Sequence, residues 1–99
     1  MVKMTSANRF DPDAVNINNG ETIAWQNAAT SAHTATFNPA AGSPLIASNV
    51  LLPEGVATFD SGDLEPGKTW SHTFTTPGTY KYICIRHASL GELGTVIVK

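Results

Sequence analysis

The chain has 99 residues, a formal net charge of −2, 41% hydrophobic residues and 14% charged residues. A chain of this length cannot fill two hydrophobic cores, so we expect residues 1–99 to form one domain. The composition argues against disorder, and the scattered basic residues argue against nucleic-acid binding. No apolar run approaches the roughly 20 residues that span a bilayer, which predicts a soluble domain without a membrane span.

Short segments with alternating apolar and polar residues predict β-strands along the chain. In chain order these segments are 2–5, 15–17, 22–26, 33–37, 57–59, the stretch holding Trp70, His72 and Phe74, 80–84 and 94–99. Residues 38–56, with repeated proline and glycine, are expected to form an irregular excursion over the surface. About seven to eight short strands with turn residues between them predict an all-β fold, a Greek-key β-sandwich or barrel.

Three side chains are candidate metal ligands: Cys84, His87 three residues later, and His33 far upstream. A thiolate and an imidazole three residues apart can bind one ion when the chain turns sharply after a strand. Each residue also has an ordinary interpretation, Cys84 as a small buried side chain and each histidine as a core or surface residue. Because Cys84 is the only cysteine, core packing or a bound metal, and not a disulfide, must stabilise the domain.

An ordered series of motifs resembles the cupredoxins, the small type 1 copper proteins of the plastocyanin, pseudoazurin and amicyanin group. The motifs are Phe10-x-Pro12, Gly20-x-x-x-x-Trp25-x-Asn27, His33, Pro66-Gly67-x-x-Trp70, Phe74, Gly78-x-Tyr80-x-Tyr82-x-Cys84-x-x-His87 and Gly94-x-Val96. The resemblance implies a sandwich that binds one copper ion, Cu(I) or Cu(II), between loops at one end. It also implies that His33, Cys84 and His87 are copper ligands, because imidazole and thiolate accept both oxidation states.

The axial ligand departs from the family pattern. Cupredoxins usually have a methionine three or five residues after the loop histidine, and these positions hold Leu90 and Glu92 here. Only Glu92 keeps the family's spacing to Gly94, so we expect Glu92 near the metal, an arrangement similar to that of the red copper protein nitrosocyanin. The alternative is that Glu92 points to solvent and leaves a coordination position for water. A carboxylate at the metal would favour Cu(II) and lower the reduction potential.

Two further departures lie beside the candidate ligands. Arg86 stands where the family often has proline, and it is either solvated or able to attract an anionic partner. Thr34 stands where asparagine is common, which weakens any inference about hydrogen bonds around Cys84. His72 alternates with two aromatic residues and is expected to be structural. A small acidic cluster is either solvated or used for docking; it consists of Asp60, Asp63 and Glu65.

The ligand set and the small size predict a soluble one-electron carrier, with a redox partner protein docking near His87. The missing methionine leaves a second hypothesis, a copper-dependent oxidoreductase that binds or converts a small molecule such as nitric oxide or another nitrogen oxide. A third is copper storage or zinc binding, since the same ligands suit tetrahedral zinc. Because cupredoxins generally work outside the cytoplasm, the resemblance implies a periplasmic or other extracytoplasmic protein whose signal peptide has been removed.

Overall fold

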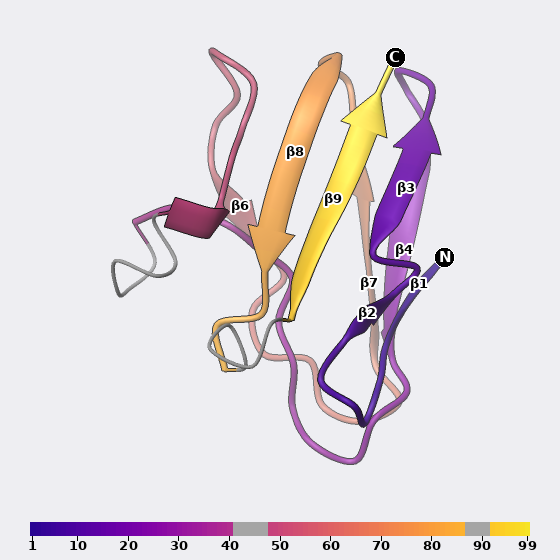
Figure 1. Ribbon diagram of the computed structural model, residues 1–99. Helices are drawn as coiled ribbons and strands as arrows, with labels where there is room; N and C mark the ends of the chain where they lie inside the picture. Colours follow the sequence, from indigo (N-terminus) through magenta and orange to yellow (C-terminus); the bar gives the residue numbers. More distant parts are fainter. Residues whose placement is uncertain (41–47, 87–91) are drawn as a thin grey trace.

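The strands of the computed structural model, which describes residues 1–40, 48–86 and 92–99, belong to two sheets. The first sheet has the order β2-β1-β4-β7, with β1 Val2–Met4, β2 Phe10–Asp11, β4 Thr22–Asn27 and β7 Thr69–Thr73. The second has the order β3-β9-β8-β5-β6, with β3 Ala14–Ile17, β5 Thr36–Phe37, β6 Phe59–Asp60, β8 Gly78–Ile83 and β9 Leu93–Val98. Strands β8, β9 and β3 lie in front of β4 and β7 in Figure 1, so the sheets are two layers of a sandwich. The predicted all-β sandwich is confirmed.

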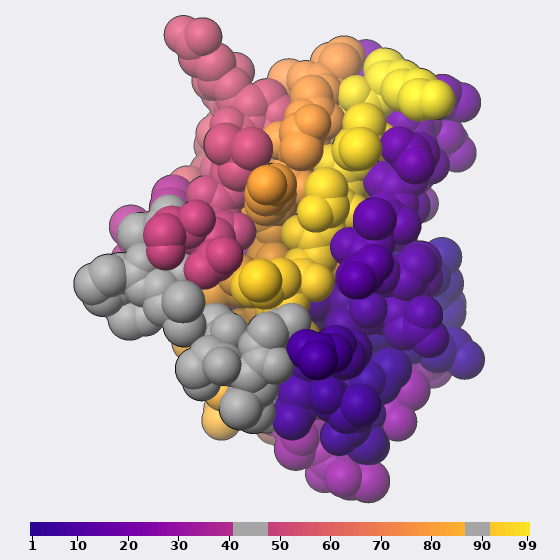
Figure 2. Space-filling view, in the orientation of Figure 1, coloured from indigo at the N-terminus to yellow at the C-terminus, as the bar shows by residue number. Residues whose placement is uncertain are grey.

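Pairing within the sheets is mixed. Strands β4 and β7 are antiparallel, as are β8 and β9, whereas β1 runs parallel to β4 and β3 runs parallel to β9. Figure 2 shows the outer face of the second sheet, where the atoms of β9 lie between those of β8 and β3. None of the helical backbone within the described ranges is long and apolar enough to cross a membrane.

Several segments differ from the sequence prediction, among them the predicted strand 57–59, which is observed as β6 Phe59–Asp60. Strand β2 was not predicted, because two residues are too short to show alternation. Strand β5 is shorter than the predicted segment 33–37, since every residue from 33 to 37 is buried and the segment has no exposed face. In the expected surface excursion, residues 48–49 are helical and Leu51 forms a bridge with Lys81, while residues 41–47 lie outside the described residues.

The core between the sheets is aromatic. The ring of Trp25 on β4 lies 5.1 Å from that of Trp70, 5.9 Å from that of Phe37 and 5.6 Å from that of Tyr82. The Trp25 indole N–H donates to the Tyr82 hydroxyl at 3.1 Å, which satisfies both buried polar groups. A Cβ at Gly94 would lie 2.6 Å from Cε1 of Tyr82, so this residue must be glycine for the Tyr82 ring to lie against β9.

Candidate metal centre

Cys84 and Glu92 are brought together by the antiparallel pair β8 and β9. Cys84 directly follows β8, and Glu92 directly precedes β9. The last pair in the register is Ile83 opposite Leu93, and the backbone N–H of Cys84 donates to the carbonyl of Glu92 at 3.2 Å. Both residues therefore lie where β8 ends and β9 begins, and these strand ends are at the lower side of Figure 1.

His33 reaches this end from a different part of the chain. Its backbone forms an antiparallel bridge with Leu64, with N–H to O distances of 3.1 and 2.8 Å. The imidazole Nδ1 of His33 lies 2.8 and 2.9 Å from the two carboxylate oxygens of Glu92, and 4.0 Å from Sγ of Cys84. One donor atom from each of His33, Cys84 and Glu92 lies within 4.8 Å of the other two.

The structure thus brings together three of the four side chains predicted to bind the metal. His33, Cys84 and Glu92 are each 0% exposed. The alternative in which Glu92 points to solvent is wrong, because the register of β9 and the contact with His33 direct its carboxylate inward. His87 lies outside the described residues, so its role remains a prediction.

The electrostatic environment of Cys84 disfavours a bare thiolate. Burial raises the pKa of the Cys84 thiol, and the negative charge of Glu92 raises it further, while the backbone N–H of Thr34 lowers it by donating to Sγ at 3.3 Å. A bound cation would offset both unfavourable effects, because a metal ion stabilises the deprotonated sulfur.

Thr34 is a supporting residue whose role the sequence did not reveal. Its backbone N–H bonds to Cys84, and its hydroxyl oxygen accepts the N–H of Ile85 at 2.9 Å. Thr34 therefore holds both the Cys84 side chain and the amide of the next residue, Ile85. The only available signal was that a hydrogen-bonding residue, threonine, stands where the family often has asparagine.

Arg86 binds an acid of this chain. Its guanidinium donates to both carboxylate oxygens of Asp63, from Nε at 3.0 Å and from Nη2 at 2.8 Å. This pairing holds the pKa of Asp63 below its usual value. The acid is also next to Leu64, the bridge partner of His33, so the pair links the segment after Cys84 to the segment beside His33.

His72 lies on β7 and does not join this group. Its ring stacks on Phe59 at 3.9 Å and on Trp70 at 5.7 Å, and burial lowers its pKa. These contacts support the structural role expected from the sequence.

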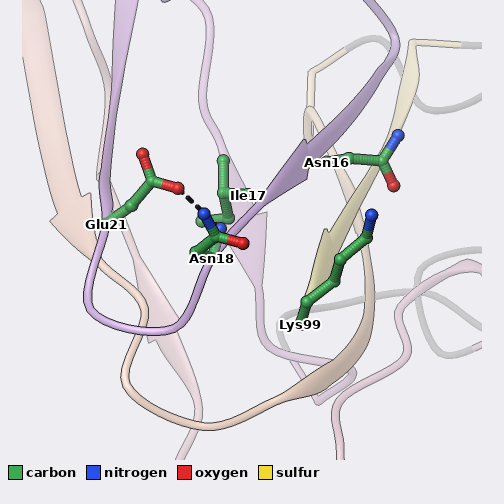
Figure 3. A pocket seen from close by; sticks show the side chains of 5 residues that line it. All are labelled: Asn16, Ile17, Asn18, Glu21 and Lys99. Carbon is green, nitrogen blue, oxygen red and sulfur yellow. Dashed lines mark hydrogen bonds between the residues drawn. The ribbon is translucent and has the colours of Figure 1, made fainter.

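Two surface pockets lie apart from the three candidate ligands. One is lined by Asn16, Ile17, Asn18, Glu21 and Lys99, where β3 and β9 end, and Figure 3 shows the Glu21 carboxylate accepting the backbone N–H of Asn18 at 2.6 Å. The other is lined by Thr5, Arg9, Phe10, Asp11, Pro12 and Asp13. None of the three candidate ligands lines either pocket, so neither pocket gives a small molecule a route to them.

Comparison with known proteins finds copper-binding proteins among the relatives of this chain. The model of the family "Copper binding proteins, plastocyanin/azurin family" matches residues 2–99. A plastocyanin of Dryopteris crassirhizoma is 30% identical over 93 residues, which cover 92% of this chain and 88% of that protein. The chloroplastic plastocyanin of Oryza sativa subsp. indica is 34% identical, but the match covers 90% of this chain and only 54% of the rice protein, about half its length.

Solved structures share the fold. A purple cupredoxin from Nitrosopumilus maritimus has a TM-score of 0.73 at 22% identity, over 99% of this chain and 97% of that one. A Cu(I) form of an amicyanin mutant has a TM-score of 0.75 at 26% identity, over 99% of this chain and 79% of that one.

The donor set that the structure gathers fits copper. Imidazole nitrogen and thiolate sulfur bind both Cu(I) and Cu(II), and a carboxylate oxygen adds a hard ligand that suits Cu(II). These donors meet at one end of the sandwich, in a chain whose family match spans residues 2–99. The chain therefore belongs to the plastocyanin/azurin family of copper-binding proteins and is a cupredoxin, a protein that binds one copper ion.

Proposed function

We propose that this cupredoxin is a small mobile carrier, formed by residues 1–99 as one domain, that accepts an electron from one redox partner protein and delivers it to another. His33, Cys84, His87 and Glu92 hold the copper ion. The observation that carries the proposal is the convergence of three wholly buried donor side chains within 4.8 Å. The place of His87 rests on its spacing from Cys84 and on the family resemblance.

The bound copper ion would supply the one-electron chemistry, and the chain would hold the donors still. His33 is fixed by its bridge to Leu64, Cys84 by the hydrogen bond that Thr34 donates to its sulfur, and Glu92 by its place before β9. Donors held by backbone structure rearrange little between oxidation states, which favours fast electron transfer.

The burial of Glu92 bears on the competing hypothesis. Binding or conversion of a nitrogen oxide needs a coordination position that a small molecule can reach. The carboxylate of Glu92 instead faces His33 inside the protein, which supports the carrier and favours a low reduction potential. No observation on the described residues specifically favours the small-molecule reaction.

The proposed setting follows from the family. We place the protein outside the cytoplasm, in a periplasm or an equivalent compartment, where its partners would be other redox proteins. The rice plastocyanin carries a location in its name, chloroplastic.

Visible absorption and electron paramagnetic resonance spectra recorded after adding Cu(II) to the metal-free chain test the proposed ligands. We expect an intense thiolate-to-copper band that is absent from Cys84→Ser and from His33→Gln. His72→Gln is the matched control, because His72 lies on β7 with aromatic neighbours, and it should keep the band. A colourless wild-type chain would contradict the proposal and leave zinc as the better candidate.

Stopped-flow kinetics separate the two functions. A carrier exchanges electrons rapidly with a redox protein, and its spectrum does not respond to nitric oxide. Slow exchange together with a spectral change on adding nitric oxide would favour the oxidoreductase.

A further inference from the structure

A continuous series of hydrogen bonds leads from the surface to the chain beside Cys84. The hydroxyl of Thr36 donates to Oδ1 of Asp60 at 3.1 Å. The hydroxyls of Thr34 and Thr36 are 2.9 Å apart, and the hydroxyl oxygen of Thr34 accepts the N–H of Ile85 at 2.9 Å. Asp60 is exposed, whereas Thr34 and Thr36 are buried.

The direction of these bonds is fixed by the number of protons. A hydroxyl has one proton, and Thr36 donates its proton to Asp60, so Thr34 must be the donor to Thr36. Every bond therefore points the same way, from the Ile85 N–H through both hydroxyls to the carboxylate. Aligned bonds of this kind polarise one another, and a charged acceptor at the end strengthens them most.

Thr34 transmits this arrangement to the cysteine. Its hydroxyl holds the amide that follows Cys84, and its own backbone N–H donates to Cys84 Sγ at 3.3 Å. A hydrogen bond to a metal-bound sulfur withdraws electron density from it, so its strength affects the reduction potential.

The geometry points to Asp60, Thr36 and Thr34 as a positioning relay that fixes the Cys84–Ile85 segment and tunes the copper–thiolate centre from the surface. This inference rests on the proposed function, because it requires Cys84 to hold the copper. It also gives Asp60 a role other than solvation or docking, since its carboxylate is the terminal acceptor of the relay. Its second bond, accepted from the Gly62 N–H at 2.9 Å, keeps that carboxylate in place.

The first test uses the metal-free chain and Thr36→Val, which keeps the shape of the side chain and removes the hydroxyl. The Thr36 hydroxyl bonds to Thr34 and Asp60, and the Thr34 hydroxyl accepts the Ile85 N–H, so the relay connects the substitution to that amide. In amide NMR spectra we expect the Ile85 proton to shift upfield and to exchange faster with solvent. Thr36→Ser should restore the wild-type shift.

Thr22→Val is the matched control. It also removes a threonine–threonine hydrogen bond, at 2.7 Å from Thr22 to Thr73, but in the other sheet. The Ile85 amide should be unchanged in this variant. Should Thr36→Val fail to fold, Asp60→Asn takes its place at the exposed end of the relay, with Glu54→Gln as its control. An Ile85 amide that is the same in Thr36→Val or Asp60→Asn as in the controls would overturn the relay.

The second test uses the copper form. We expect Thr36→Val to lower the reduction potential and to shift the thiolate-to-copper band, with Thr36→Ser and Thr22→Val unchanged. A shifted Ile85 amide with an unchanged potential would overturn the link to the copper centre. A wild-type chain with no thiolate-to-copper band would instead contradict the proposed function, and the metal-free spectra would still decide whether the relay fixes the segment.

Discussion

Both carboxylate oxygens of Glu92 lie within hydrogen-bond distance of Nδ1 of His33, at 2.8 and 2.9 Å. The contact joins two of the residues proposed to hold the copper ion, and Glu92 stands at a position where the family resemblance predicts a methionine. Because both side chains are fully buried, Glu92 is part of the packing around His33, and its carboxylate is one of the donor groups that lie within 4.8 Å of one another.

Replacing Glu92 with methionine should raise the reduction potential of the copper form and move its absorption toward that of plastocyanin. The physical reason is that an anionic oxygen stabilises Cu(II), whereas a thioether does not. Voltammetry and visible spectroscopy measure both effects. Glu54→Met, at an exposed position, controls for the lost charge, and a Glu92→Met spectrum identical to wild type would place Glu92 away from the metal.

Tyr82→Phe should lower the free energy of unfolding by about 1–3 kcal/mol, because the Trp25 indole N–H would lose its acceptor inside the core. Urea unfolding of the metal-free chain measures the change. Tyr80→Phe is the comparison, since its hydroxyl donates to the Thr76 carbonyl at a partly buried position. A loss in Tyr82→Phe no greater than in Tyr80→Phe would contradict the importance of the buried bond.

His72 should make stability fall with acidification. In the folded state, burial lowers the pKa of His72 below its ordinary value of 6.5. As the pH falls, the unfolded chain therefore binds the proton at a higher pH than the folded chain does. This stabilising contribution is complete above pH about 6.5 and is lost as the pH falls through the folded pKa. His72→Phe keeps an aromatic ring in the stack and removes the titration. As the pH is lowered from about 7.5 to about 5, the unfolding free energy of this variant should rise relative to that of wild type. A difference that stays constant with pH would show that His72 is not the group responsible.

Arg86→Ala should change the charge preference of electron exchange. The side chains of Arg86 and Asp63 are 50% and 51% exposed, so the substitution uncovers the Asp63 charge near the copper centre. Exchange with a cationic ruthenium ammine complex should become faster and reduction by ferrocyanide slower, with both effects diminishing at high salt. The control Lys81→Ala also removes one positive charge, from β8, and should change these exchange rates less. Equal changes in the two variants would indicate a response to net charge alone.

Much of the fold could be predicted because apolar and polar residues alternate in its longest strands, and this alternation indicates which face is buried. Residues 22–27 alternate between buried residues and exposed or half-buried ones, and the predicted strand 22–26 differs from β4 by one residue. The segment 33–37 could not be predicted as well, because it is buried on both sides and local alternation disappears. Strand β2 is defined only by its pairing with β1.

The candidate site, like the fold, could be predicted only in part. Spacing and resemblance identified His33, Cys84 and Glu92 as candidate ligands of one metal ion, because motifs and their spacing can be read from the sequence alone. The inward orientation of Glu92 and the role of Thr34 depend on contacts between residues 59 and 51 positions apart. No local pattern contains such contacts. The position of His87 stays a prediction.

The central place of β9 has a consequence for the order in which the molecule can assemble. A ribosome makes the chain from its N-terminus, yet β3 and β8 both pair with β9, the last strand of the sequence. The second sheet cannot close, and Glu92 cannot meet His33, until residues 93–98 have been made. Until then the chain holds His33, Cys84 and His87 without a placed Glu92, so the proposed four-ligand site is still incomplete.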